Sequence, residues 1–158
     1  QVVRHFSGMS VLDNVRVALF YGGRRERSQA QATTRALAIL EEVGLAGRQD
    51  DLAEALTLSG QKRLEIARAL ATEPKLILLD EVMAGLTGTE VKEFLAAIRQ
   101  IKERRRLTIL VVEHVMQALM QLSGRVVVLH HGELIAEGPP RAIAEDERVI
   151  DAYLGRAP

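Results

Sequence analysis

Cysteine and tryptophan are both absent from the 158-residue sequence, and aromatic residues make up only 3% of it. Without cysteine the chain can form no disulfide, no thiolate zinc site and no thiol nucleophile, a composition typical of a reducing compartment. No apolar stretch approaches the roughly 20 residues that a membrane-spanning helix needs. Any role at a membrane is therefore expected to depend on a partner protein, without direct insertion.

An excess of either charge is also lacking, because 21 Lys and Arg residues balance 21 Asp and Glu residues. A formal net charge of zero gives no electrostatic reason to expect nucleic-acid binding. The sequence does contain 47% hydrophobic and 27% charged residues, which is typical of a globular protein with a substantial core. The length favours one domain or slightly more.

Helical patterns occupy much of the chain. Capping-box patterns at Ser10 and at Thr87, the latter with Glu90 three residues later, predict two helix starts. Gly44 and Pro74 are typical of residues that follow a helix end. The expected helices run from near Ser10 to Phe20, over Ala30–Val43, over Gln61–Thr72, and from Thr87 through Ile101.

Two apolar runs predict strands, Leu76–Asp80 and Thr108–Val112, each adjoining a helical pattern. A continuous apolar run is typical of a parallel strand that is buried on both faces. Arg125–His130 and Glu133–Glu137, joined around a Gly, favour a hairpin. The alternation of strand and helix predicts an α/β fold, a parallel-sheet core carrying an N-terminal helical lobe.

Two adjacent carboxylates, Asp80 and Glu81, end the first apolar run, and His114 follows the second. The carboxyl ends of parallel strands are where open α/β sheets bind ligands. A first carboxylate there can hold Mg²⁺, and a second can act as general base. Many buried strands also end in an acid with no such role, so the residues alone leave both interpretations open.

The order of five segments resembles the ATP-binding cassette (ABC) ATPases. These segments look like the family's Q-loop, signature, Walker B, D-loop and H-loop, and they are Gln1, LTLSGQKRLEIARAL (56–70), LILLDE (76–81), AGL (84–86) and VVEH (111–114). Further segments resemble the branched-chain amino acid uptake subgroup, namely FSGMSVLDNV (6–15), AEGPP (136–140) and VIDAYLG (149–155). The resemblance implies a partial P-loop NTPase (RecA-like) core. Residues 1–58 would hold the Q-loop end and the helical subdomain, and residues 59–158 the C-terminal part of the core.

The resemblance also implies roles for single residues. Asp80 and Gln1 would help to hold Mg²⁺, and Glu81 would be the general base toward the attacking water. His114 would contact the γ-phosphate, and Gln1 would couple the nucleotide state to the helical lobe. Each residue also has an alternative without a catalytic role. Glu81 could cap the following turn, His114 could be a structural turn residue, and Gln1 could be an arbitrary polar residue.

The signature departs from the family's common Leu-Ser-Gly-Gly-Gln. Counting back without gaps from the helix places Leu56 to Gly60 on these five positions, with Thr57 in place of the serine. Sliding the match to begin at Leu58 fits more letters but shifts the helix register. The residues implied to bind nucleotide in trans are Thr57, Leu58, Ser59, Gly60 and Gln61.

The D-loop implied by the resemblance is Ala84, Gly85, Leu86 and Thr87. Val82, Met83 and Thr87 stand where the family usually has Pro, a small hydroxyl residue and Asp. The Thr87 hydroxyl is instead suited to cap the helix that follows.

A P-loop needs Gly-Lys followed by Ser or Thr, and none of the four lysines follows a glycine. The chain is therefore expected to be a fragment that is inactive alone. The implied whole protein binds ATP and Mg²⁺, pairs with a second ATPase subunit as a homo- or heterodimer, and contacts transmembrane permease subunits through the helical lobe. It would lie in the cytoplasm, peripheral to the cell membrane. A non-catalytic remnant of the same fold and a non-transport ABC ATPase are the alternatives.

Overall fold

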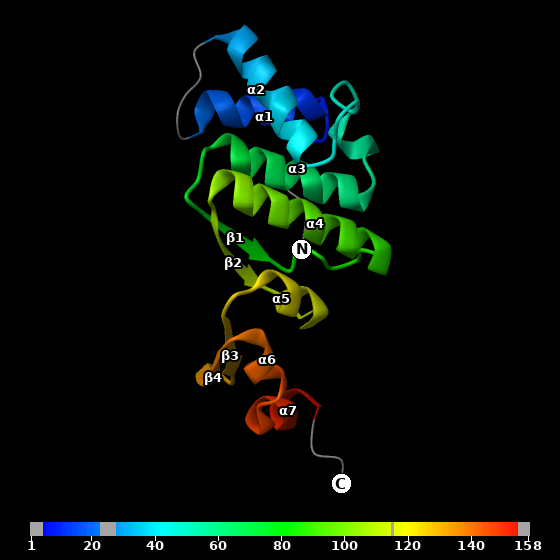
Figure 1. Cartoon of the computed structure of the whole chain (residues 1–158). Helices are drawn as coiled ribbons and strands as arrows, with labels where there is room; N and C mark the ends of the chain where they lie inside the picture. The colour runs from blue at the N-terminus through cyan, green and yellow to red at the C-terminus, as the bar shows by residue number, and fades with distance from the viewer. Residues whose placement is uncertain (1–4, 23–27, 115, 155–158) are drawn as a thin grey trace. The chain divides into compact units, whose positions relative to one another are not determined.

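The computed structural model describes residues 5–22, 28–114 and 116–154, and Gln1 lies outside these residues. The chain divides into two compact units, Gln1–Val112 and Glu113–Pro158 (Figure 1). The division predicted near residue 58, between a helical lobe and the core, is a division by function. The contacts that define the two compact units do not test it, so it stays a prediction.

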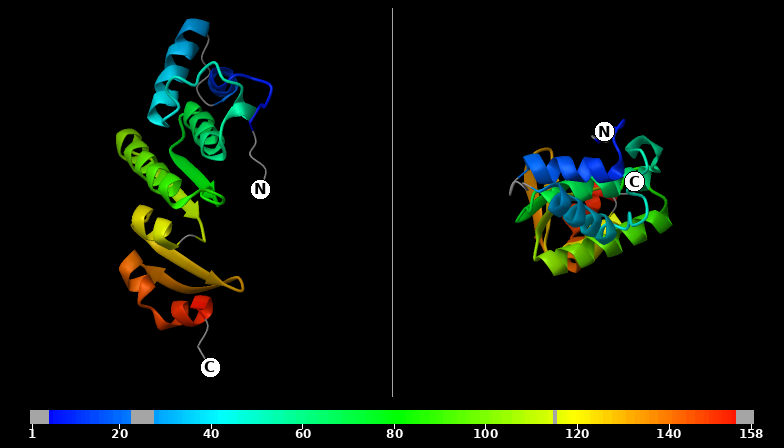
Figure 2. Two further views of the ribbon diagram at one scale, coloured as in Figure 1. Left: turned by 90° about the vertical axis from the view of Figure 1, so that its right-hand side faces the viewer. Right: turned by 90° about the horizontal axis from the view of Figure 1, so that it is seen from above.

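Three packed helices form the first part of unit 1: α1 (Val11–Tyr21), α2 (Gln29–Glu42) and α3 (Leu58–Ala71). Figure 2 shows them from two further directions. The predicted start at Ser10 is confirmed, because its side chain accepts a hydrogen bond from the Asp13 N–H at 3.0 Å. The predicted end of α2 is also confirmed, since Val43 caps it and Gly44 follows with φ at +76°, a conformation that glycine adopts without steric cost.

Main-chain hydrogen bonds join the start of α1 to a distant segment that leads into the short 3-10 helix η1 (Ala53–Ala55). The N–H of Val11 donates to Asp51 O at 2.9 Å, and the N–H of Ala53 donates to Met9 O at 3.0 Å. A third bond runs from the Leu12 N–H to Gln49 O at 3.0 Å. The chain around residue 50 is thereby attached to the beginning of the helical lobe.

The second part of unit 1 contains the predicted parallel strands. β1 (Leu76–Asp80) pairs with β2 (Thr108–Val112) in parallel, in the register Leu76↔Thr108 through Asp80↔Val112. Between them runs α4 (Gly88–Arg105), whose apolar stripe is buried at Phe94, Leu95, Ile98 and Ile101. These elements confirm the predicted strand–helix–strand order, and they fit the α/β fold class.

The expectation that β1 is buried on both faces is wrong for the described residues. Ile77 and Leu79 are buried, but Leu76 and Leu78 are 52% and 66% exposed. Successive side chains of a strand point to opposite faces of the sheet. The described residues of unit 1 therefore cover one face of the β1–β2 sheet and leave the other uncovered, the face on which Leu110 and Val112 of β2 are also exposed.

Unit 2 is a hairpin covered by short helices. β3 (Val126–His130) pairs antiparallel with β4 (Glu133–Gly138), which confirms the predicted hairpin. Its turn contains His131 and Gly132, both with positive φ. α5 (Met116–Leu122), α6 (Pro140–Ala144) and α7 (Glu147–Leu154) complete the unit. Its core consists of Val126, Val128, Ala136, Ile143 and Val149.

Arg105, at the end of α4, ties three helices of unit 1 together. Its Nε and Nη2 donate to the two carboxylate oxygens of Glu42 at 2.8 and 2.9 Å, and its Nη1 donates to Leu70 O at 3.3 Å. Both charged side chains are about three-quarters buried, with 25% and 23% exposed. A bidentate, partly desolvated pair of this kind is stronger than a solvated one.

Replacing Arg105 with alanine should lower the free energy of unfolding by about 1.5 to 3 kcal/mol, because charge-assisted hydrogen bonds are lost and Glu42 keeps an unpaired charge. Arg125 pairs with Glu137 at 2.9 Å with 74% and 43% of the side chains exposed. Arg125→Ala is therefore a matched control that should stay within about 0.5 kcal/mol of the parent. Urea denaturation measures both, and equal losses would contradict the prediction.

Candidate functional site

The acid pair lies at the carboxyl end of the parallel strands. Asp80 is the last residue of β1 and is exposed. Glu81 follows with φ at +46°, in the left-handed region that non-glycine residues seldom adopt. Its N–H donates to Val112 O at 2.8 Å, and Val112 is the last residue of β2. This bond extends the pairing of the two strands and holds Glu81 at the edge of the sheet.

A compact turn from Glu81 to Thr87 leads into α4. The Ala84 N–H donates to Glu81 O and the Leu86 N–H donates to Met83 O, both at 3.2 Å. Gly85 has φ at +79°, which suits the residue without a side chain. The D-loop residues predicted from the resemblance therefore form a turn directly after the acid pair.

Thr87 is the N-cap of α4, as predicted. Its Oγ1 accepts from the Glu90 N–H at 3.3 Å, and its own N–H and hydroxyl donate to Glu90 Oε2, each at 2.8 Å. The Thr87 N–H, then the Thr87 hydroxyl and then the charge of Arg63 lower the pKa of Glu90. The Thr87 hydroxyl is thus occupied by the helix cap.

The signature-like segment is the first turn of α3, and the predicted helix start at Gln61 is wrong by three residues. Thr57 is the N-cap, and its Oγ1 accepts from the Gly60 N–H at 3.2 Å. Because of this cap, Leu58, Ser59 and Gly60 are already helical. The Gln61 side chain turns back and donates to Leu56 O at 3.1 Å.

The hydrogen bonds already formed within this turn limit which of its N–H groups could bind an anion. Helix N-termini present N–H groups without intrahelical partners. The Gly60 N–H is bonded to Thr57, which leaves those of Leu58 and Ser59 as the first-turn groups with no partner within the helix. Ser59 is 8% exposed.

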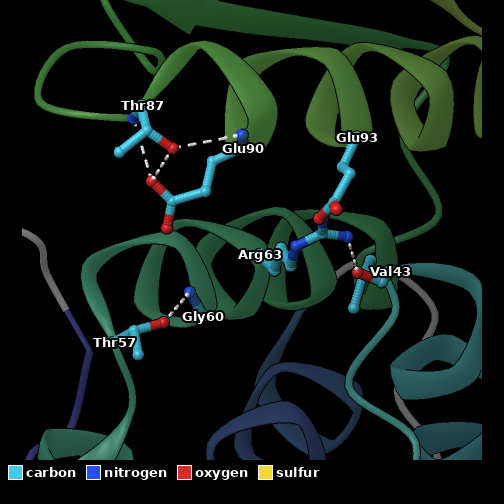
Figure 3. A network of polar contacts seen from close by, with 7 residues as sticks. All are labelled: Val43, Thr57, Gly60, Arg63, Thr87, Glu90 and Glu93. Atoms are coloured by element: carbon cyan, nitrogen blue, oxygen red, sulfur yellow. Dashed lines mark hydrogen bonds and ion pairs between the residues drawn. The ribbon is translucent and has the colours of Figure 1, made fainter.

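The signature-like turn and the D-loop turn lie against each other. A β-carbon placed on Gly85 would come within 2.9 Å of Leu58 Cδ2. Deeper along the same helices, Arg63 of α3 donates to Val43 O at 2.8 Å and pairs with Glu93 of α4 at 3.7 Å. Figure 3 shows this network beside the caps at Thr57 and Thr87. Unit 1 therefore brings the acid pair, the D-loop residues and the start of α3 into one region.

His114 lies two residues beyond β2 and is exposed. It belongs to unit 2, which begins at Glu113. Gln1 falls outside the described residues. The roles predicted for both residues stay predictions.

Sequence reasoning missed Asn14, which is fully buried in α1. Its Oδ1 accepts from the Phe6 N–H at 2.8 Å, and its Nδ2 donates to the carbonyls of Phe6 and Ser10, both at 3.0 Å. Arg68 of α3 lies over the Phe6 ring at 4.7 Å. An asparagine on the apolar side of a helix was the available signal, because such an amide must be satisfied by hydrogen bonds.

Comparison with known proteins identifies the family. A sequence model described as "ABC transporter" matches residues 1–84, which is more than half of the 158 residues. The chain belongs to the ABC transporter family. A second model, "Branched-chain amino acid ATP-binding cassette transporter", matches residues 133–158 of this cassette.

Relatives of the cassette are similar over nearly its full length. The high-affinity branched-chain amino acid transport ATP-binding protein LivG of Escherichia coli is 38% identical over 99% of this chain. The alignment covers 66% of LivG. The cassette described here therefore spans just under two thirds of the length of this relative.

Solved ABC structures share the fold. The ADP conformation of MJ1267, an ATP-binding cassette of an ABC transporter, superposes with a TM-score of 0.80 at 27% identity, over 95% of this chain and 64% of that one. The dimeric post-hydrolysis cassette MJ0796, bound to ADP and Pi, gives a TM-score of 0.77 at 26% identity, over 89% and 61%. These matches confirm the predicted P-loop NTPase class. Within the described residues of this ABC cassette, none of the helices has the length and apolar character to span a membrane.

Proposed function

We propose that this chain is part of the ATP-hydrolysing subunit of an ABC transporter that imports branched-chain amino acids or related solutes. The observation that supports hydrolysis best is Glu81, held immediately after Asp80 by its bond to Val112 at the carboxyl end of two parallel strands. The match of residues 133–158 and the name of LivG support the solute class.

In the proposed reaction, the Glu81 carboxylate accepts a proton from a water molecule. The water oxygen forms a bond to the γ-phosphorus of ATP as the bond from that phosphorus to the β–γ bridging oxygen breaks. ADP leaves with the electron pair of the broken bond, and inorganic phosphate is the second product. From the family resemblance, His114 would contact the γ-phosphate and help to orient the water, and the amide of Gln1 would contact both the water and the bound Mg²⁺ ion.

The oxygen donors present suit Mg²⁺, which prefers one or two carboxylates together with phosphate oxygens and water. Asp80 supplies an exposed carboxylate, and Gln1 an amide oxygen. When bound, the ion neutralises the charge that develops on the phosphates.

A second ATPase subunit completes the proposed site. The first turn of α3, Thr57 to Gln61, would face the phosphates bound by that subunit, and the turn Ala84–Thr87 would contact it as a D-loop. The Thr57 hydroxyl already caps α3, so the N–H groups of Leu58 and Ser59 would carry most of the phosphate contact. The dimeric state of the related MJ0796 cassette supports this arrangement.

Permease subunits are the proposed partners of the helical lobe in residues 1–58. Their attachment would hold the ATPase at the cytoplasmic face of the membrane. A non-catalytic remnant is the second candidate, because the sequence contains no Gly-Lys pair. A Gly-Lys-Ser or Gly-Lys-Thr motif elsewhere in the encoded protein would remove this candidate.

Uptake measurements test the proposed transport. Deleting the gene that encodes this chain should abolish high-affinity uptake of radiolabelled leucine, isoleucine and valine, and the complete gene product should restore it. The 158-residue chain alone should not restore uptake, because it lacks a P-loop. Unchanged uptake of all three amino acids in the deletion strain, with loss of another solute, would contradict the solute class.

A further inference from the structure

We infer that Met83 is a positioning residue that holds Glu81 in its left-handed conformation, and this inference rests on the proposed role of Glu81. Met83 is only 1% exposed, one of the largest fully buried side chains in the described chain. It lies two residues after the acid pair, in a turn whose other members are partly or largely exposed. No sequence motif gave it a role, since it stands where the family usually has a small hydroxyl residue.

The backbone of Glu81 needs support from its surroundings. A non-glycine residue at φ +46° is in a conformation that persists only where the surrounding structure over-determines it. On one side its N–H is bonded to Val112 O at 2.8 Å, and on the other its carbonyl accepts from the Ala84 N–H at 3.2 Å. The second bond holds only while the turn stays closed.

Met83 stabilises this turn through its buried side chain and through its carbonyl. Its side chain is buried while its carbonyl accepts from the Leu86 N–H at 3.2 Å, so one residue anchors the turn in the core and pairs across it. The turn is attached a second time where Gly85 lies against Leu58 of α3. Removing the buried thioether would release the first attachment, and Glu81 could then relax to an ordinary backbone conformation.

Relaxation would move the carboxylate away from the attacking water without altering the groups that hold ATP. A general base works only within hydrogen-bond reach of the proton it accepts, and a displacement of about 1 Å can cost roughly 100-fold in rate. Met83→Ala should therefore lower kcat by roughly 10- to 100-fold, with the KM for ATP unchanged. Met83→Leu, which conserves volume, should keep most of the activity.

The experiment measures steady-state ATP hydrolysis and thermal unfolding of the complete gene product. Leu19→Ala is the matched control, because Leu19 is also fully buried but lies in α1. It should lower the melting temperature and leave kcat per folded molecule unchanged. If Met83→Ala behaves like Leu19→Ala, the positioning role is overturned.

Two further variants keep the outcomes distinct. If Met83→Ala does not fold, the smaller truncation Met83→Val should still lower kcat at constant KM, and an unchanged kcat overturns the inference. Glu81→Gln separates the inference from the proposed function. Lost turnover in Glu81→Gln with normal kcat in Met83→Ala overturns the inference alone, whereas full turnover in Glu81→Gln overturns both.

Discussion

Replacing Glu81 with glutamine should lower ATP turnover of the complete gene product by about 100- to 10,000-fold, the range that general-base catalysis contributes. Glutamine has nearly the same shape as glutamate but cannot accept the proton of the attacking water. The backbone bond from Glu81 to Val112 O does not depend on the side chain, so the turn should keep its conformation. ATP should therefore bind with unchanged affinity and accumulate unhydrolysed between paired subunits.

Glu90→Gln provides the matched control for this substitution. Glu90 is a carboxylate of the same neighbourhood, but its bonds to Thr87 form a helix cap, and glutamine also serves in a capping box. Turnover of Glu90→Gln should stay close to that of the parent. Phosphate release under saturating ATP measures both variants, and a Glu81→Gln enzyme that turns over normally would eliminate Glu81 as the base.

Replacing Asn14 with leucine should lower the free energy of unfolding by about 2 to 5 kcal/mol. The substitution keeps the volume of a fully buried side chain but removes its hydrogen bonds to the Phe6 N–H and the Phe6 carbonyl. Each buried polar group left unsatisfied costs about 1 to 3 kcal/mol. The loss should exceed that of Arg105→Ala, because the Asn14 side chain is fully buried, whereas the side chain of Glu42 is 23% exposed and can regain water.

Thr33→Ala is the control for Asn14→Leu. The Thr33 hydroxyl also donates to a main-chain carbonyl, that of Gln29 at 2.9 Å, but on the exposed side of α2, so its loss should change stability by less than about 0.5 kcal/mol. Urea denaturation gives the free energies, and amide hydrogen exchange at Phe6 reports the local effect. A loss below about 1 kcal/mol for Asn14→Leu, within the net contribution of one ordinary hydrogen bond, would contradict the stabilising role of the Asn14 hydrogen bonds.

The features that the sequence predicted correctly depend on neighbouring residues. The caps at Ser10 and Thr87 each require a partner only three residues away, so the pattern is visible in the sequence. The start of α3 was predicted too late, because Thr57 is followed three residues later by Gly60. The main-chain N–H of Gly60 donates to the Thr57 hydroxyl, but glycine has no acidic or amide side chain that would complete a capping-box pattern in the sequence.

The features that could not be predicted from the sequence depend on contacts between residues that are far apart in the chain. Arg105 and Glu42 are 63 positions apart, and nothing in either local pattern indicates their pairing. The exposed face of β1 is a similar case, because an apolar run such as Leu76–Leu79 does not show which of its two faces other segments cover. The burial of Met83 likewise follows from tertiary packing, so the D-loop pattern alone gave it no meaning.

The attachment of residues 49–53 to the start of α1 has a consequence for how this lobe can diversify. Its three hydrogen bonds join main-chain atoms only, from Val11, Leu12 and Ala53 to Asp51, Gln49 and Met9. Every amino acid except proline offers the same N–H and C=O groups. Val11 and Ala53 are fully buried, whereas Met9, Leu12, Gln49 and Asp51 are partly exposed. Substitutions at the four partly exposed positions can therefore change the surface of the lobe while the backbone keeps its shape, so new surface properties can evolve here without a new fold.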